Sequence, residues 1–280
     1  MDSVKEIDIF DNIIESSSVN LYLQLIKVPN LDNLILRNNN ILEIRENVGL
    51  VNPSNLKMLD LIKSLKNVTA LKNLDLSYNN IKKIESRSFS HLSFLESLLL
   101  SHNVIDDLEK STFDGLLSIL ESNSFADLKA LSCLFLSSNL EMDVLGKPFS
   151  ETQSLNELSL DNVKVRFTFA KWNIYTAKLN LQSCRIRDIN NLFVFDVKGV
   201  EILNLRENEI TSIDKFSFQS MDSLIILDLS MNKISFIQPG SFLRTTRISI
   251  LDMSNNNIET LHFETRHWGI VLLIQQKYLC

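Results

Sequence analysis

The chain has 280 residues, of which 45% are hydrophobic, and its formal net charge is −6. Apolar residues are numerous enough for a large core, while the acidic balance and the lack of a basic patch interleaved with aromatic residues argue against a nucleic-acid partner. No apolar run reaches the roughly 18 residues of a transmembrane helix, and the charged N-terminus lacks the residue order of a signal peptide.

One short motif recurs along most of the chain. It has apolar residues at its first, fourth, sixth and eleventh positions and asparagine at its ninth. The alternation in its middle predicts a short, half-buried strand. Because one such strand cannot bury its apolar face alone, successive copies must stack as a parallel sheet over a continuous core. A phenylalanine at the nineteenth position is predicted to fill the core behind that sheet; it recurs as Phe89, Phe113, Phe149, Phe218 and Phe242.

The first two copies begin at Val4 and Leu31. The next clear copy begins at Leu71, 40 residues later, so we expect an irregular segment near residues 46–66. That segment is predicted to be a variable loop or helical turn, with a degenerate strand around Leu56, Leu59 and Leu61. We expect the copies at Leu71 and Leu95, which are 24 residues apart, to be regular.

The middle of the chain departs from this period twice. The step from Leu95 to Leu131 is 36 residues, which predicts either a bulge on the convex side or a missing exon near residues 116–131. The copy at Leu155 has Val163 in the asparagine position and continues into an aromatic-rich segment, 163–176. We interpret that segment as a repacked convex layer in preference to a ligand pocket. The motif returns at Thr176.

Three copies beginning at Val200, Leu224 and Ile248 follow a strict spacing of 24 residues and are the best formed. The sequence therefore predicts about ten repeats in one solenoid over residues 1–263. Residues 264–280 are predicted to be a non-repeat C-terminal tail, which either closes the last strand edge or lies outside the pattern. The apolar part of the tail is too short to span a bilayer.

The asparagine of each copy is predicted to be structural. An Asn amide offers two donors and an acceptor, so stacked side chains can bond the backbone groups of adjacent buried turns. Cys184 occupies this position in its copy and is interpreted as a core residue. The predicted ladder consists of Asn12, Asn39, Asn79, Asn103, Asn139, Cys184, Asn208, Asn232 and Asn256.

The motif, the 24-residue period and the phenylalanine position resemble extracellular leucine-rich repeat proteins, such as Toll-like receptor ectodomains, chaoptin-like adhesion proteins and secreted immune proteins. The resemblance implies an α/β horseshoe with a parallel sheet on its concave face and irregular or short helical convex segments. It also implies that partners bind at the concave face. The outward strand positions that we nominate for binding are Glu157, Ser159, Asp161, Lys178, Gln182, Arg206, Ile226, Asp228, Ser230, Ile250, Asp252 and Ser254.

The predicted function is a non-catalytic protein-binding scaffold for innate immune recognition or cell adhesion, at the cell surface or outside the cell. The alternative is a cytoplasmic scaffold that regulates a signalling enzyme. We find no phosphate-binding loop, nucleophile elbow, CxxC pair or metal-spaced histidine cluster, so we predict no catalytic residue, cofactor or metal. The expected partner is a protein ligand or co-receptor, and a dimer is compatible with this class. The one N-glycosylation sequon begins at Asn67. The absence of a leader and of a cysteine-rich cap suggests a fragment of a longer protein.

Overall fold

The structure is a computed structural model of the chain, and it describes residues in nearly every copy of the motif. The described residues are 4–11, 30–41, 43–44, 70–84, 89, 92–105, 128–139, 154–163, 174–189, 197–215, 217–218, 220–243, 245–259 and 271–273. For residues 43–44, 83–84 and 271–273 the description is limited to the backbone.

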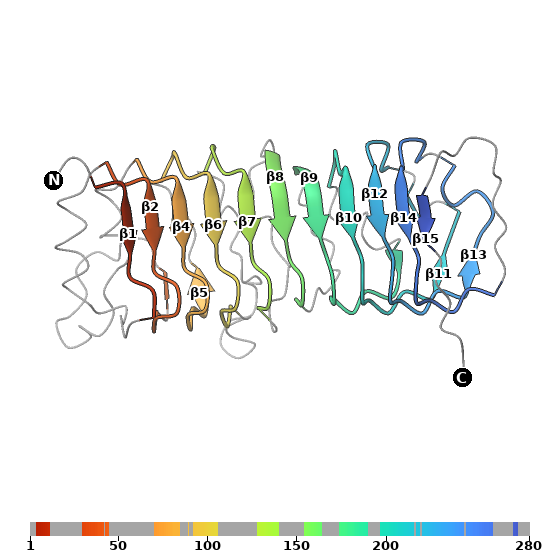
Figure 1. Cartoon of the computed structure of the whole chain (residues 1–280), viewed down its shortest axis with the longest axis horizontal. Coiled ribbons are helices and arrows are strands. Elements are labelled where there is room, and N and C mark those ends of the chain that lie inside the picture. Colours follow the sequence, from red (N-terminus) through yellow and green to blue (C-terminus); the bar gives the residue numbers. More distant parts are fainter. Residues whose placement is uncertain are drawn as a thin grey trace, which may run out of the picture.

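Eleven short strands lie side by side in one parallel sheet, which runs the length of the molecule (Figure 1). The first ten strands each come from one predicted repeat. In sheet order the strands are β1 (Glu6–Asp8), β2 (Asn33–Ile35), β4 (Asn73–Asp75), β6 (Ser97–Leu99), β7 (Cys133–Phe135), β8 (Ser154–Ser159), β9 (Tyr175–Asn180), β10 (Ile202–Asn204), β12 (Ile226–Asp228), β14 (Ile250–Asp252) and β15 (Val271–Leu273). The fold is therefore a parallel β-solenoid.

The irregular steps in the sequence leave the sheet unbroken. Leu34 of β2 pairs directly with Leu74 of β4, and Leu98 of β6 pairs directly with Leu134 of β7. The degenerate strand expected near Leu56 falls on residues that the structure does not describe. Residues 46–66, most of 116–131 and most of 163–176 also lie outside the described residues. The strands on either side of each long step are therefore in register with one another.

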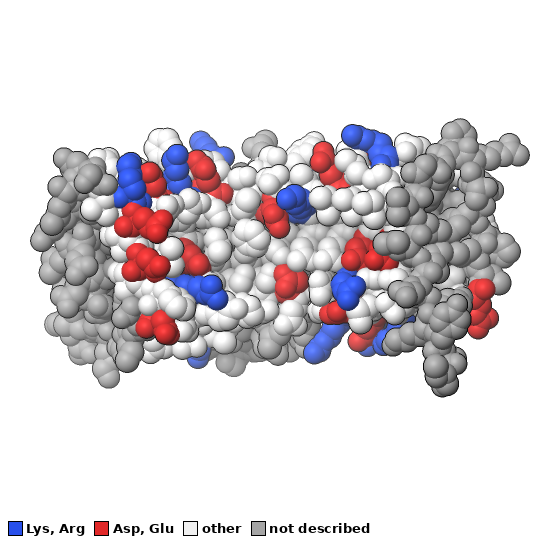
Figure 2. Space-filling view, viewed as in Figure 1, with Lys and Arg blue, Asp and Glu red and all other residues white. Residues whose placement is uncertain are grey.

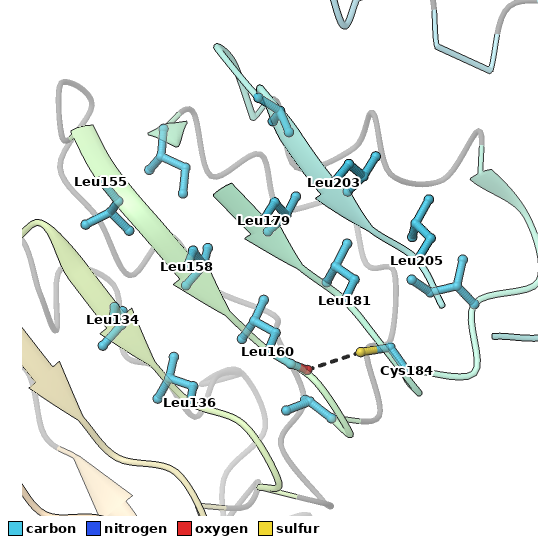
Figure 3. Close-up of a cluster of buried hydrophobic side chains, with 14 of the residues drawn as sticks. Leu134, Leu136, Leu155, Leu158, Leu160, Leu179, Leu181, Cys184, Leu203 and Leu205 are labelled. Atoms are coloured by element: carbon cyan, nitrogen blue, oxygen red, sulfur yellow. Dashed lines mark hydrogen bonds between the residues drawn. The ribbon is translucent and has the colours of Figure 1, made fainter. Parts of the chain in front are cut away.

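The core lies on one side of this sheet, under the leucines of the motif. Leu224, Leu227 and Leu229 have no exposed surface, and the equivalent residues from the second repeat onward are nearly as buried. In the first repeat Val4, Ile7 and Ile9 are only partly buried. In Figure 3 the leucines of β7 to β10 form rows that cross the strands on this side of the sheet. Each row extends from one repeat to the next, so burial requires the neighbouring repeats. We call the opposite face of the sheet the concave face.

The phenylalanine position also contributes to the core. Phe89, Phe218 and Phe242 are all buried, and the rings of Phe218 and Phe242 stack with their centroids 5.3 Å apart. Phe113 and Phe149 lie outside the described residues. The aromatic position of adjacent repeats is thus a packing contact, which adds dispersion energy to the leucine rows.

The first ten strands of the sheet are each followed by a turn with a left-handed residue, and the turn after β9 contains a second one, Arg185. The residue before the asparagine position has a φ between 54° and 59° in all ten repeats, and none of these residues is glycine. Its backbone N–H donates to a carbonyl of the next repeat, as from Glu207 to Ser230 at 3.0 Å. The interstrand ladder therefore continues beyond the strand, into the turn.

Two further pairs of strands follow these turns. β3 (Glu43–Ile44) pairs with β5 (Lys83–Ile84), and β11 (Ser212–Ile213) pairs with β13 (Phe236–Ile237), both in parallel. The sequence predicted irregular or short helical structure there. Among the described residues no α-helix follows the turn, because the backbone of successive repeats is close enough to pair again.

The sheet also extends into the C-terminal segment that the sequence assigned to a tail. Val271–Leu273 pairs in parallel with β14, with Val271 opposite Ile250. The other residues of 260–280 lie outside the described part. Among the described residues, no helix has the length and apolar character needed to cross a membrane.

Candidate functional site

The concave face carries the side chains that alternate with the buried leucines. In β12, Leu227 is buried while Ile226 and Asp228 are partly exposed on the other side, as period-two alternation requires. Because the strands are in register, equivalent residues form columns across the sheet. On this face acidic and basic residues are interspersed, and neither sign of charge forms a large patch (Figure 2).

A hydrogen-bonded cluster lies at the centre of the concave face, after β7 and β8. The carboxylate of Asp161 accepts from the hydroxyls of Ser137 and Ser159, the latter at 2.7 Å, and from the Asn180 amide at 3.1 Å. The Asn180 amide also donates to the Ser159 oxygen at 3.0 Å. Asp161 is therefore bound by three donors from three repeats, which fixes the charge in place.

A second cluster continues the polar surface over the next two repeats. Glu207 accepts from the Ser183 hydroxyl at 3.0 Å and from the Gln182 amide at 3.3 Å, and it pairs with Arg206 at 3.3 Å. These interactions lower the pKa of Glu207, with the Ser183 hydrogen bond as the largest cause. Arg206 also donates to the Ser230 hydroxyl at 3.0 Å. Glu207 thus remains ionised, with its side chain 39% exposed.

An aliphatic stripe runs beside these clusters. Ile202, Ile226 and Ile250 are register partners on β10, β12 and β14, and each is at least partly exposed. Ile250 is 37% exposed. Asp228 and Asp252 lie in the column on the other side of the buried leucines, and each accepts from the backbone N–H two residues later, Asp228 from Ser230 at 2.8 Å. This "isoleucine stripe" is the most apolar run of adjacent outward positions in the C-terminal half of the described sheet.

The nominated binding residues fall into distinct environments. Glu157 and Lys178 form a part-exposed ion pair at 3.8 Å, and Ser254 is half-buried. Ser159 and Ser230, however, are buried, with 4% and 0% exposure. We correct their role: they lie beneath Asp161 and Arg206 and position those groups, so they do not offer a contact surface. The alternation of the strand, which predicted them outward, does not account for the side chains of neighbouring repeats that cover them.

The asparagine ladder connects the repeats on the other side of the turn. The Asn232 amide donates to Leu205 O at 2.9 Å and Leu229 O at 3.0 Å, and its oxygen accepts from Ile210 N at 3.1 Å. Asn79, Asn103, Asn139, Asn208 and Asn256 make equivalent bonds, and Asn39 makes the donor half. Asn12 lies outside the described residues, as does Asn67.

Cys184 replaces the amide in this ladder with a thiol. Its Sγ donates to Leu160 O at 3.1 Å (Figure 3), and Asn208 accepts from the Cys184 backbone N–H. Burial raises the pKa of the Cys184 thiol to about 12. The thiol therefore remains protonated and donates a hydrogen bond to the carbonyl of the preceding repeat, as the Asn amide does in the other repeats.

The N-terminal end of the concave face carries a row of stacked groups that the sequence reasoning missed. The Arg37 guanidinium lies over the Phe10 ring at 5.7 Å and over the Tyr78 ring at 4.5 Å, and Tyr78 stacks on His102 at 4.1 Å. These residues occupy the seventh or eighth position of their motifs. Alignment of the repeats in columns would have placed them side by side. We call them the Arg37 row.

No cluster of three or more potential metal ligands among His, Cys, Asp and Glu occurs within the described segments. In this part of the chain the carboxylates accept from hydroxyl, amide or backbone donors, pair with Lys or Arg, or lie singly on the surface. The arrangement is suited to molecular contact.

The family profile described as "Leucine rich repeat" matches residues 69–121, 175–234 and 198–258. The chain is 32% identical over 157 residues to Tsukushi of Gallus gallus, covering 54% of this chain and 38% of that protein. It spans about two fifths of the length of the curated relatives it matches.

Two solved structures illustrate the fold. The leucine-rich repeat domain of APL1B is 19% identical, with a TM-score of 0.65, over 97% of this chain and 69% of that one. The FLRT2 leucine-rich repeat structure, solved in an octameric complex with Latrophilin 3 and Unc5D, is 18% identical, with a TM-score of 0.61, over 90% and 76%.

Proposed function

We propose that this chain, whose repeats match the leucine-rich repeat profile and resemble the extracellular, 24-residue type, is a non-catalytic scaffold that binds a protein partner. The binding surface is the concave face of residues 200–258, and the observation that carries the proposal is the isoleucine stripe. The proposed setting is recognition outside the cell, in innate immunity or cell adhesion. The FLRT2 leucine-rich repeat domain assembles with other proteins, which supports partner binding by this fold.

The stripe has the composition of a contact core. Three aliphatic side chains lie on adjacent strands about 4.8 Å apart. Exposing such side chains to water does not stabilise the chain, so an exposed apolar run of this kind indicates a contact site. Burying each against a partner contributes on the order of 1 kcal/mol, since they are already half-buried. Asp228, Asp252 and Arg206 border the stripe and supply the polar rim that such interfaces have.

The test is a set of surface variants titrated against a partner obtained from a displayed cDNA library of the source organism. Ile226→Asp and Ile250→Asp should each weaken binding at least tenfold, because a desolvated carboxylate in a contact core lacks a partner. Because these isoleucines are half-buried strand residues, the free energies of unfolding should fall by about 1–2 kcal/mol, which leaves the protein folded. Lys233→Asp, exposed beyond the asparagine turn, is the matched control and should bind normally.

Equal affinity for Ile226→Asp and Lys233→Asp would show that the isoleucine stripe is not the contact surface. The extracellular setting has its own test at Asn67. Expression with a secretory leader should yield glycan at Asn67, and the same site in protein isolated from native tissue should be occupied. An unoccupied native Asn67 beside an occupied recombinant one would favour the cytoplasmic alternative.

A further inference from the structure

The Arg37 row has an arrangement of charge and rings that its own chain does not use. Arg37 is exposed, and its guanidinium carbon lies 5.7 Å from the Phe10 ring centroid and 4.5 Å from the Tyr78 ring centroid. Within the described part of the chain, no oxygen atom accepts a hydrogen bond or forms an ion pair with this guanidinium. The two ring contacts therefore restrain an exposed guanidinium whose donors are not used by the described residues.

The backbone fixes the rings that hold Arg37. Tyr78 and His102 occur at the same turn position of adjacent repeats, with φ of 54° and 55°. The Tyr78 N–H donates to Ser101 O at 2.9 Å and the His102 N–H to Ser137 O at 2.8 Å, so both turns are tied to their neighbours. The repeat spacing of about 4.8 Å then sets the two rings near stacking distance. A guanidinium held this way loses little conformational entropy when a ligand bonds to its edge.

The neighbouring charges restrict what that ligand can be. Asp8 and Asp75 belong to the strands on either side of β2, and Asp11 lies in the first turn. Each carboxylate already accepts from a local donor: Asp8 from Phe10 N, Asp75 from Ser77 N and Asp11 from the Asn38 amide. With three carboxylates around a single guanidinium, the net charge of the row is negative, and the row therefore repels a polyanion such as nucleic acid. A single carboxylate approaching the guanidinium edge can still form a bidentate pair.

We propose that the Arg37 row is a second protein-contact surface, at which Arg37 binds one Asp or Glu side chain of the partner and Phe10 and Tyr78 contact the apolar residues beside it. Tyr and Arg are the residue types that dominate binding energy at protein interfaces. The inference rests on the proposed function only in that the partner is a protein.

The two surfaces are far enough apart to bind different parts of one partner. Arg37 and Arg206 occupy the same motif position on β2 and β10, which are six strand intervals apart. At about 4.8 Å per interval the separation is roughly 29 Å. A partner that bridges both surfaces would gain affinity from linkage of two weak contacts.

The experiment follows the arginine Nε–Hε resonances of the full chain by NMR, with acetyl-Leu-Glu-Leu-amide as the probe. The Arg37 resonance, assigned by its loss in Arg37→Lys, should shift in a saturable way at millimolar peptide. The peptide with Gln in place of Glu should bind at least tenfold more weakly. Tyr78→Leu should weaken binding about threefold or more, because the closer of the two ring contacts to the guanidinium is then lost. Arg206 is the internal control, since its guanidinium is bonded to Ser230 and Glu207.

Three outcomes would overturn the proposal. They are no saturable shift of Arg37, an equal shift of Arg206, or tighter binding of inorganic phosphate than of the Glu peptide. The last result would make the row a general anion site. Because the probe is a free peptide, the result does not depend on the isoleucine stripe. If the peptide binds at Arg37 but Ile226→Asp leaves the affinity for the partner unchanged, the proposed function is refuted while the proposal for the Arg37 row stands.

Discussion

Removal of one ladder side chain, Asn232→Ala, should destabilise the solenoid strongly although the site lies away from the proposed contact surface. Leu205 O would still accept from Asn208, and Leu229 O would still accept from Asn256. Each carbonyl thus loses one of two bonds, a net cost of about 0.5–1.5 kcal/mol apiece.

The donor side of the same residue is more costly. Ile210 is fully buried, and the only hydrogen bond of its N–H within the described residues is to the Asn232 oxygen at 3.1 Å. An orphaned buried donor costs about 1–3 kcal/mol. The expected total is therefore about 2–6 kcal/mol.

Urea unfolding followed by far-UV circular dichroism measures this loss. Lys233→Ala, the exposed neighbour of Asn232, is the control and should change the free energy of unfolding by less than about 0.5 kcal/mol. A loss below about 1 kcal/mol for Asn232→Ala would refute the reasoning. Water or a shift of the backbone would then satisfy the hydrogen-bonding groups of the turn. The asparagine ladder would in that case contribute little to the free energy of unfolding.

Four further predictions concern the turns and the ionisable groups. Met231 has a φ of 56°, so Met231→Val should cost about 1–3 kcal/mol in urea unfolding while Met231→Asn should be nearly neutral; equal values would contradict the strain argument. At pH 8 a disulfide reagent should modify the half-exposed Cys133 well before the buried Cys184, as peptide mass spectrometry would show. The folded Cys184 thiol keeps its proton to about pH 12 while the unfolded thiol loses it near 9, so its stabilising contribution is complete below pH 9 and lost as the pH rises toward 12. The stability advantage of the parent over Cys184→Ala should therefore narrow from pH 8 to pH 11, and a constant difference would refute the burial argument. Ser183→Ala should raise the pKa of Glu207 in a carbon-detected NMR titration, whereas an unchanged pKa would mean that the hydroxyl does not hold the carboxylate.

The sequence was sufficient to predict the solenoid, because its determinants repeat. Leu227, Leu229 and Asn232 occupy fixed motif positions, and a single period accounts for their burial and their hydrogen bonds. The direct pairing of β2 with β4 was not predictable, since a 40-residue step could have contained another strand. The left-handed turns were also missed, because Tyr78 and Met231 are residue types that seldom adopt them.

The candidate site was predicted less well, for a physical reason. Whether an outward residue is exposed depends on side chains from adjacent repeats, which the motif does not specify. Ser230 is covered because Arg206 reaches it from the repeat before, and Arg37 is stacked because rings from two other repeats flank it. Alternation along a strand predicts the face on which a residue lies. The neighbours across the strands decide whether it can meet a partner.

Site-specific photo-crosslinking tests the central claim most directly. A benzophenone amino acid is placed at Ile226 on the isoleucine stripe, or at Lys233 beyond the asparagine turn, and the protein is irradiated on tissue of the source organism. A discrete protein adduct from position 226, with none from position 233, is the predicted result. An adduct from position 233 with none from position 226 would contradict the assignment of the concave face as the contact surface.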